Sequence, residues 1–323
     1  MSGTQSIPPV ESLDRVAILI PCYNEALTIG KVVDDFSREM PGSTIYVYDN
    51  NSSDGTADIA REHGATVVHE PRQGKGNVVR QMLRDIDADC YLMVDGDDTY
   101  PAESGPEMCG YILRGEADHV VGDRLSNGTY GDENDRAFHG FGNNLVRWLI
   151  ALLYGFRYTD VMTGYRAMSR EFVKTLPVLS PGFEIETGLS IHAVDKGWRI
   201  KQVPIVYRDR PEGSESKLST FSDGAKVLRM IATLFKDYKP LGFFSVLALL
   251  FMVIGLMLGV PVISEFLATG LVPRLPSAIA AVAFCGLAAL LFTCGLMLDT
   301  VVKGNRRQWE LEVIRVFGEK GGR

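Results

Sequence analysis

Three carboxylates stand within four residues of one another, directly behind a run of apolar residues. The segment MVDGDDTYP (93–101) places Asp95, Asp97 and Asp98 after CYLMV, which has the composition of a buried strand. Like charges this close repel one another unless water or a cation screens them. Residues two apart in an extended segment point to the same side, so Asp95 and Asp97 can converge. We expect this pair to hold a cation, and Asp98 is either part of the site or a solvated turn residue.

The donor atoms indicate the kind of cation. No His or Cys accompanies the two aspartates, and none of the five histidines in the chain forms a dyad or a metal motif. Carboxylate oxygens without nitrogen or sulfur ligands favour hard ions, so we expect Mg²⁺ or Mn²⁺. An ion of this kind would in turn hold a diphosphate.

A sheet must position these side chains. Short apolar or β-branched runs alternate with helical patterns, which predicts an α/β fold whose parallel strands are covered on both faces by helices. The expected strands are RVAILI (15–20), TIYVYD (44–49), ATVVHE (65–70) and CYLMVD (90–95). In such sheets ligands bind beyond the carboxyl ends of the strands.

Three of these strand ends are followed by polar clusters. They are PCYNE (21–25), DNNSSDGT (49–56) and DGDDTYP (95–101). Any one of them could be an ordinary turn, but three at one edge of a sheet indicate a binding site. No GxGxxG follows the first strand, and RQGKGN (72–77) is not a P-loop, because Gly76 follows Lys75 where Ser or Thr is required. A dehydrogenase and a P-loop NTPase are therefore disfavoured.

Composition excludes other classes of function. The chain has 323 residues, 46% of them hydrophobic, and a net charge of −7, which argues against a nucleic-acid-binding protein. Its five cysteines contain no CxxC pair, so neither a disulfide framework nor a zinc site is expected, and a reducing compartment is indicated. The first fifteen residues lack the basic start and apolar core of a signal peptide.

The C-terminal third has a different character. Residues 241–263 and 278–298 carry no charge, and each run is long enough to cross a bilayer core of about 30 Å as a helix. A short loop (264–277) joins them. Basic residues flank the pair on its outer sides: Lys226, Arg229, Lys236 and Lys239 before it, and Lys303, Arg306 and Arg307 after it. The positive-inside tendency then predicts a multi-pass cell (inner) membrane protein with both termini and the catalytic domain in the cytoplasm.

These motifs resemble a known family. PCYNE, DNNSSDGT, GKGN and DGDDTYP are similar in order and spacing to the family-two glycosyltransferases of the GT-A fold. TGYRAMSREF (163–172), GFEIET (182–187) and RPEGSESKLST (210–220) resemble a narrower group, the polyprenyl-phosphate glycosyltransferases, which includes dolichol-phosphate mannose synthases and bacterial bactoprenol glucosyltransferases. The resemblance covers about residues 15 to 302. It implies a mixed, mostly parallel sheet flanked by helices and followed by a two-helix transmembrane hairpin.

The motifs and apolar runs together predict domain boundaries. The expected parts are a flexible N-terminus (1–14), a cytosolic GT-A catalytic domain (15–220), a juxtamembrane amphipathic helix (221–240), two transmembrane helices (241–263 and 278–302) and a cytosolic tail (303–323). Two stretches, 141–156 and 223–238, have the pattern of helices that lie in a membrane interface, although either could equally pack into the core.

The resemblance also implies roles for single residues. Those expected to bind the nucleotide sugar are Pro21, Tyr23, Glu25, Asp49, Lys75, Asp95 and Glu184. The metal ligands would be Asp95 and Asp97, with Asp97 the firmer one, and Thr99 stands where dolichol-phosphate mannose synthases commonly carry a third ligand, Gln. Glu184 and its neighbour Glu186 either position sugar hydroxyls or brace loops.

Cations are needed where a lipid phosphate meets a sugar diphosphate, because the two anions repel each other. The candidates are Arg124, Arg136, Arg166, Arg210 and Lys217, which together with Asp97 form the expected catalytic set.

The expected reaction is an inverting transfer of glucose from UDP-glucose to undecaprenyl phosphate on the cytosolic face of the membrane. A phosphate monoester is largely dianionic at neutral pH, so no general base is required. The alternatives are a GDP-mannose-dependent mannose synthase, a processive polysaccharide synthase and a non-catalytic membrane scaffold. The resemblance is also compatible with a homo-oligomer.

Overall fold

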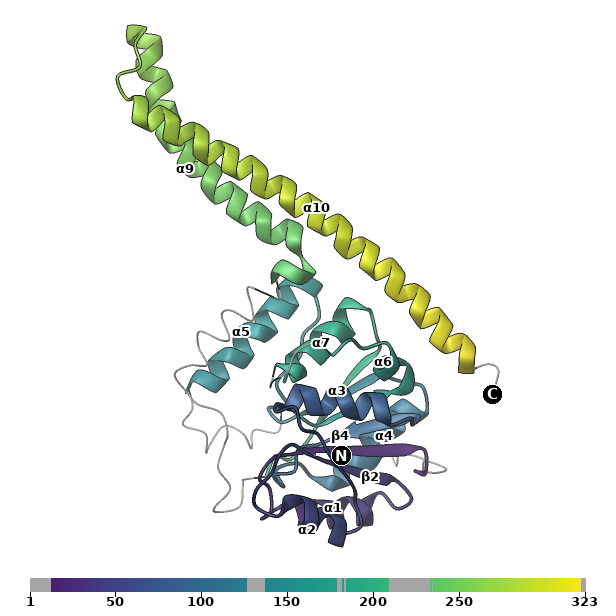
Figure 1. Ribbon diagram of the computed structural model, residues 1–323. Helices are drawn as coiled ribbons and strands as arrows, with labels where there is room; N and C mark the ends of the chain where they lie inside the picture. Colours follow the sequence, from purple (N-terminus) through teal and green to yellow (C-terminus); the bar gives the residue numbers. More distant parts are fainter. Residues whose placement is uncertain are drawn as a thin grey trace, which may run out of the picture. The chain divides into compact units, whose positions relative to one another are not determined.

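The computed structural model describes residues 13–126, 137–178, 182, 184–208, 233 and 235–320 (Figure 1). The chain divides into two compact units. One comprises Met1–Gly224 with Glu312–Arg323, and the other comprises Ala225–Leu311.

A seven-stranded sheet forms the centre of the first unit. Its strands, in the spatial order β3-β2-β1-β4-β6-β5-β7, are β1 (Val16–Cys22), β2 (Thr44–Asp49), β3 (Thr66–His69), β4 (Cys90–Met93), β5 (His119–Asp123), β6 (Arg166–Ser169) and β7 (Ile200–Pro204). β6 runs antiparallel to both of its neighbours, and the other paired strands are parallel. The prediction of a mixed, mostly parallel sheet is therefore confirmed.

Helices cover both faces of this sheet (Figure 1). The helices of this unit are α1 (Ile29–Glu39), α2 (Thr56–Glu62), α3 (Lys75–Asp85), α4 (Gly105–Leu113), α5 (Ala137–Tyr154), α6 (Arg170–Lys174) and α7 (Ile185–Asp195), with a 3₁₀ turn (Ala102–Ser104) before α4. Alternate strand residues point to opposite faces. In β1, Ile18 and Ile20 pack with α1, α2 and α4, whereas Ala17 and Leu19 pack with α3, α6 and α7. This two-sided burial explains why the strands are apolar throughout.

All four strands expected from the sequence are present, and β2 has the expected bounds. Because parallel strands share their direction, the carboxyl ends of β1, β2, β4 and β5 lie at one edge of the sheet. β6 begins at that same edge, since its first residue, Arg166, is paired with Met93 and Val121. The loop before β6 therefore joins the loops after the other strands at the expected ligand-binding edge.

The second unit contains the long apolar helix α9 (Pro240–Thr269) and α10 (Leu275–Lys320) as far as Leu311. They approach closely, because Gly255 leaves room for Cys285 and the rings of Phe251 and Phe284 stack with centroids 5.8 Å apart. Only 17% of the residues in the most apolar part of each helix are buried, whereas a core helix of a soluble domain is mostly buried. Both are long and apolar enough to cross a membrane.

The ends of these helices differ from the expected ones. Glu265 ends the apolar run, but α9 continues to Thr269 and stops at Gly270, whose φ of +69° is the left-handed conformation that commonly ends helices. α10 likewise continues beyond residue 302, through most of the expected tail. Charge ends the part of a helix that suits a bilayer, but it does not end the helix. The expected juxtamembrane helix (221–240) lies largely outside the described residues.

Candidate active site

The loops after β1 and β2 are hydrogen-bonded to each other. The backbone N–H of Asn24 donates to Ser52 Oγ (2.9 Å), and that of Glu25 donates to Thr56 Oγ1 (2.8 Å). Asp49, at the end of β2, is buried and accepts hydrogen bonds from the backbone N–H of Ser52. Pro21 lies within β1, and Tyr23 is 39% exposed. The structure thus brings Pro21, Tyr23, Glu25 and Asp49 to one edge, as a nucleotide site would require.

Asn50 connects this edge to the start of α3. Its Nδ2 donates to the carbonyls of Glu70 (2.8 Å) and Arg72 (2.9 Å), and its Oδ1 accepts from the backbone N–H of Gly74 (2.7 Å). Gly74 has a φ of +122°, which glycine tolerates. The buried amide of Asn50 therefore fixes the turn that precedes Lys75.

Lys75 bridges two carboxylates from different parts of the chain. Its Nζ lies 2.5 Å from Asp95 Oδ1 and 2.6 Å from Glu186 Oε1. Burial opposes the charged ammonium, but attraction to Asp95 and Glu186 outweighs it, so the pKa of Lys75 is raised above its ordinary value. The ammonium stays charged at neutral pH and offsets the repulsion between the two acids.

The three aspartates that follow β4 have different surroundings. Asp97 is buried, and Thr99 donates to its Oδ1 through its hydroxyl (2.6 Å) and through its backbone N–H (3.4 Å). Thr99 therefore supports Asp97 instead of adding a ligand of its own. Asp98 has a φ of +58°, its side chain is 12% exposed, and it pairs at 2.7 Å with Lys31 of α1, whose side chain is exposed.

Asp95 and Asp97 fit a hard divalent cation. The described residues contain no group of three or more His, Cys, Asp or Glu side chains that could hold a metal. Two carboxylates leave most of an oxygen coordination shell to the substrate's diphosphate and to water, which is the usual way in which Mg²⁺ is bound with phosphates. The donor set therefore suits an ion that arrives with its nucleotide.

Gly164, in the TGYR segment, provides the space that Asp95 occupies. The nearest atoms to a Cβ placed on Gly164 are the three carboxyl atoms of Asp95, and they are too close for any side chain. Its backbone N–H also donates to the hydroxyl of Tyr100 at 2.9 Å. The glycine is thus required by the position of Asp95, not by a turn.

We expect Gly164→Ala to weaken binding of Mn²⁺ with UDP by about tenfold, because the added methyl displaces a carboxylate ligand, and tenfold corresponds to about 1.4 kcal/mol. Electron paramagnetic resonance of free Mn²⁺ measures this affinity directly. Gly188→Ala is the matched control, since a Cβ at this α7 glycine meets no atom within 4 Å. Equal Mn²⁺ affinities for the two variants would contradict the role of Gly164.

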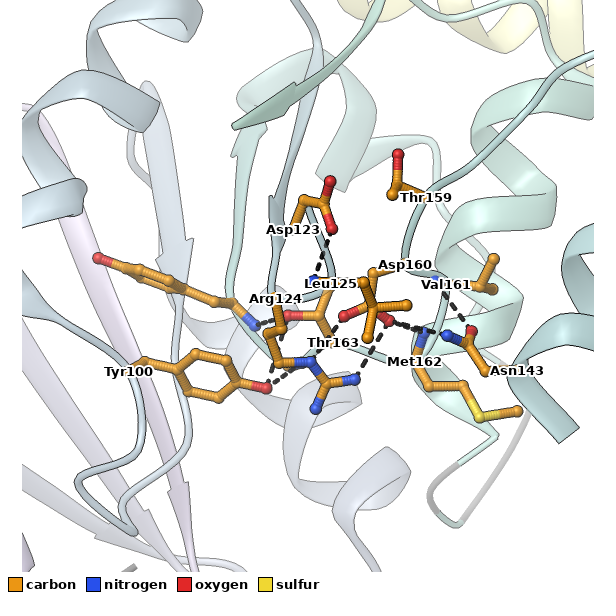
Figure 2. A network of polar contacts seen from close by, with 12 residues as sticks. Tyr100, Asp123, Arg124, Leu125, Asn143, Thr159, Asp160, Val161, Met162 and Thr163 are labelled. Atoms are coloured by element: carbon orange, nitrogen blue, oxygen red, sulfur yellow. Dashed lines mark hydrogen bonds and ion pairs between the residues drawn. The ribbon is translucent and has the colours of Figure 1, made fainter. Parts of the chain in front are cut away.

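Arg124, at the carboxyl end of β5, forms a two-pronged ion pair with Asp160 (Figure 2). Its Nε lies 2.6 Å from Asp160 Oδ2, and its Nη2 lies 3.1 Å from Oδ1. The Asp160 side chain is fully buried, and that of Arg124 is 11% exposed. Arg124 therefore lies at the expected edge, as a guanidinium held in one orientation.

Arg166 differs from expectation. It is fully buried, and its guanidinium donates to the carbonyls of Thr163 (3.0 Å) and Val161 (2.6 Å) and to Ser190 Oγ (2.9 Å). Its Nη1 also lies 3.1 Å from His119 Nε2, and burial together with Arg166 holds the pKa of His119 well below its ordinary value. A neutral imidazole accepts this hydrogen bond. The expectation that Arg166 faces a substrate phosphate is therefore wrong: Arg166 braces the loop before β6.

Three of the other expected residues cannot be placed. Arg136, Arg210 and Lys217 lie outside the described residues. Glu184 is exposed at the start of α7, and Glu186 is the glutamate of GFEIET that reaches Lys75.

Sequence reasoning did not identify four further residues that contact the site residues or support those contacts in the structure. They are Asp160, Asn143, Tyr100 and Gly164. Asp160 could have been noticed as an acidic residue shortly before TGYR, but nothing in the sequence indicates that it pairs with Arg124.

Comparisons of sequence agree with this geometry. The profile of the family described as Glycosyl transferase family 2 matches residues 17–176. Glycosyltransferase AglJ of Haloferax volcanii is 32% identical over 298 residues, which cover 91% of this chain and 96% of that protein. The dolichyl-phosphate hexose transferase of the same organism is 34% identical over 68% of this chain and 93% of its own length. Protein RfbJ of Shigella flexneri is 56% identical over 35% of this chain and 88% of its own.

Solved structures show the same fold. Glucosyl-3-phosphoglycerate synthase from Mycobacterium tuberculosis, in complex with phosphoglyceric acid, superposes with a TM-score of 0.56 at 27% identity, covering 68% of this chain and 78% of that one. The same enzyme in complex with Mn²⁺, UDP-glucose and phosphoglyceric acid gives a TM-score of 0.53 at 27% identity, with the same coverage. From the strand-end motifs, the GT-A-like sheet and these relatives, the chain belongs to glycosyltransferase family 2.

Proposed function

We propose that this glycosyltransferase moves a hexose, glucose in the first instance, from a UDP-sugar to a polyprenyl phosphate, undecaprenyl phosphate in bacteria, with inversion at the anomeric carbon. One observation supports this above others: the carboxylate pair at the sheet edge and two helices of membrane-spanning length occur in the same chain. A lipid acceptor gives a reason for that combination, since a polyprenyl chain does not leave the bilayer readily.

The relatives support the donor and the acceptor separately. The dolichyl-phosphate hexose transferase has a lipid phosphate in its name, and the structural neighbour binds UDP-glucose together with Mn²⁺. A divalent cation held by Asp95 and Asp97 would neutralise charge that develops on the departing UDP.

The chemistry needs no general base. The acceptor's phosphate monoester is largely dianionic at neutral pH, so one of its oxygens can attack the anomeric carbon directly. The new bond joins that oxygen to the carbon, the bond from the carbon to the diphosphate oxygen breaks, and UDP leaves with the electron pair. We propose that Arg124, which follows β5 and is held by Asp160, orients the incoming phosphate.

The surface of α5 is consistent with a membrane interface. Val146, Leu149 and Ile150 are buried against the catalytic unit, whereas Trp148 and Leu152, which are four residues apart on the other face, are 59% and 63% exposed. An apolar face with tryptophan, next to Arg147, suits the boundary between head groups and acyl chains. We propose that α5 lies on the cytosolic leaflet and that the basic residues beside α9 and α10 lie on the same side.

The test is to incubate purified full-length protein in detergent with undecaprenyl phosphate and a panel of radiolabelled sugar nucleotides, followed by extraction of the lipid. We expect UDP-glucose with Mg²⁺ or Mn²⁺ to label the lipid phase, and chelation of the metal to abolish the label. Labelling by GDP-mannose alone would contradict the donor, and no labelling by any donor would contradict the lipid acceptor. A long polymer in place of a single sugar would favour a processive synthase.

A further inference from the structure

A buried carboxylate, that of Asp160, pairs with Arg124 at the carboxyl end of β5. Asp160 and Arg124 share two hydrogen bonds in the planar geometry that favours an arginine–carboxylate pair. Asp160 has no exposure to solvent, so its negative charge is compensated within the protein. Buried pairs of this kind are weak evidence for stability on their own, and a positional role is the alternative reason for their presence.

The loop that carries Asp160 is fastened to α5 (Figure 2). Asn143, on the buried side of α5, donates to Asp160 Oδ1 (3.4 Å) and accepts from the backbone N–H of Val161 (3.2 Å). The backbone N–H of Met162 also donates to Asp160 Oδ1 (3.2 Å). The carboxylate is therefore fixed in position from two directions.

The guanidinium is held from a second side by aromatic rings. Arg124 lies over the ring of Tyr207, 5.4 Å from its centroid, and Tyr207 contacts Tyr100 edge to face at 5.6 Å. Tyr100 in turn accepts a hydrogen bond from Gly164, against which the carboxylate of Asp95 lies. Arg124 is thus packed between the loop of Asp160 and the residues that position Asp95.

We propose that Asp160 is a positioning residue that orients Arg124 toward the phosphate of the acceptor, and that Asn143 supports it from α5. The inference rests on the proposed function, because it needs an anionic acceptor at this edge. A free arginine side chain samples many rotamers. Ordering it in advance leaves less to be ordered when the acceptor binds, so the effect is expected in acceptor affinity.

The test is a double-mutant cycle on the full-length protein in detergent, with Asp160→Asn, Arg124→Gln and the pair. Asparagine keeps the size of Asp160 but removes its charge and one acceptor. We expect Asp160→Asn to raise the KM for undecaprenyl phosphate by about 10- to 100-fold, since hydrogen bonds to charged groups contribute about 1.5–3 kcal/mol. The KM for the UDP-sugar stays within about twofold. In the Arg124→Gln background, Asp160→Asn causes no further rise, because it acts through Arg124.

Asp118→Asn is the matched control. Asp118 is also a buried aspartate held by two hydrogen bonds from the guanidinium of one arginine, Arg199, but it lies before β5, at the opposite edge of the sheet. We expect Asp118→Asn to lower Tm without changing the KM for the acceptor. An equal rise of that KM in Asp118→Asn would show that general destabilisation, not positioning, is responsible.

Two further outcomes would overturn the inference: additive effects in the double variant, and an Asp160→Asn defect confined to the UDP-sugar. If Asp160→Asn does not accumulate as folded protein, Asn143→Ala tests the inference in its place. This variant removes a hydrogen bond to Asp160 and leaves no charge unpaired. We expect it to raise the acceptor KM by about threefold, and an unchanged value would refute the inference. Absence of lipid labelling by the wild-type protein would instead refute the proposed function.

Discussion

Replacing Asp97 by alanine is expected to abolish sugar transfer while the protein still folds. Asp97 is buried, its carboxylate is oriented by Thr99, and we propose that it holds the divalent cation together with Asp95. A metal ion that stabilises a departing diphosphate contributes several kcal/mol, and about 4 kcal/mol corresponds to about a 10³-fold loss of rate. The measurement is initial rate of label transfer to the lipid phase at saturating donor, accompanied by Mn²⁺ binding.

The neighbouring aspartate supplies the control. Asp98 is in the same loop but pairs with Lys31 on α1, and asparagine tolerates its positive φ. Asp98→Asn is therefore expected to keep transfer within about threefold of wild type, because exposed ion pairs contribute little. Undiminished turnover in Asp97→Ala, or an equal loss in both variants, would refute the assignment of Asp97 as a metal ligand.

The parts of the fold that the sequence predicts are those that depend on local pattern. The strand TIYVYD was expected at 44–49 and β2 occupies those residues, because a β-branched and aromatic run buried between helix layers leaves little choice of structure. The polar strand ends were expected at one edge for a topological reason, since parallel strands end on the same side. β6 has only four residues in its strand, RAMS, and this gave no comparable signal.

The site was predicted less completely, because its pairings join distant residues. Spacing predicts that Asp95 and Asp97 are close, but no spacing rule connects Arg124 with Asp160, 36 residues later. Arg166 illustrates the opposite error. A motif arginine after a glycine looks like a phosphate ligand, yet the first residue of a central strand lies inside the sheet, where its donors satisfy loop carbonyls.

The charge arrangement around Asp95 leads to the second large expected effect, on Lys75→Met. The variant leaves Glu186, which is 7% exposed, and Asp95, which is 26% exposed, without the ammonium that both contact. Breaking a buried ion pair destabilises proteins by about 3 to 5 kcal/mol, and we expect the lower end because Asp95 is partly solvated. In a unit of about 200 residues, 3 kcal/mol lowers Tm by about 6 to 12 °C. Because the pKa of Lys75 is raised above 10.5, the wild-type contribution is fully present below that pH and is lost as pH rises above it.

Thermal unfolding followed by tryptophan fluorescence in detergent measures this effect, and Lys31→Met is the matched control. Lys31 also bridges two acids, Asp35 and Asp98, but its side chain is 54% exposed, so its removal is expected to change Tm by only about 1 to 2 °C. Adding Glu186→Gln to Lys75→Met removes one of the uncompensated charges and is expected to recover part of the lost Tm. If Lys75→Met and Lys31→Met unfold at the same temperature, Lys75 does not hold these carboxylates together, and the position of Asp95 must be explained by Gly164 alone.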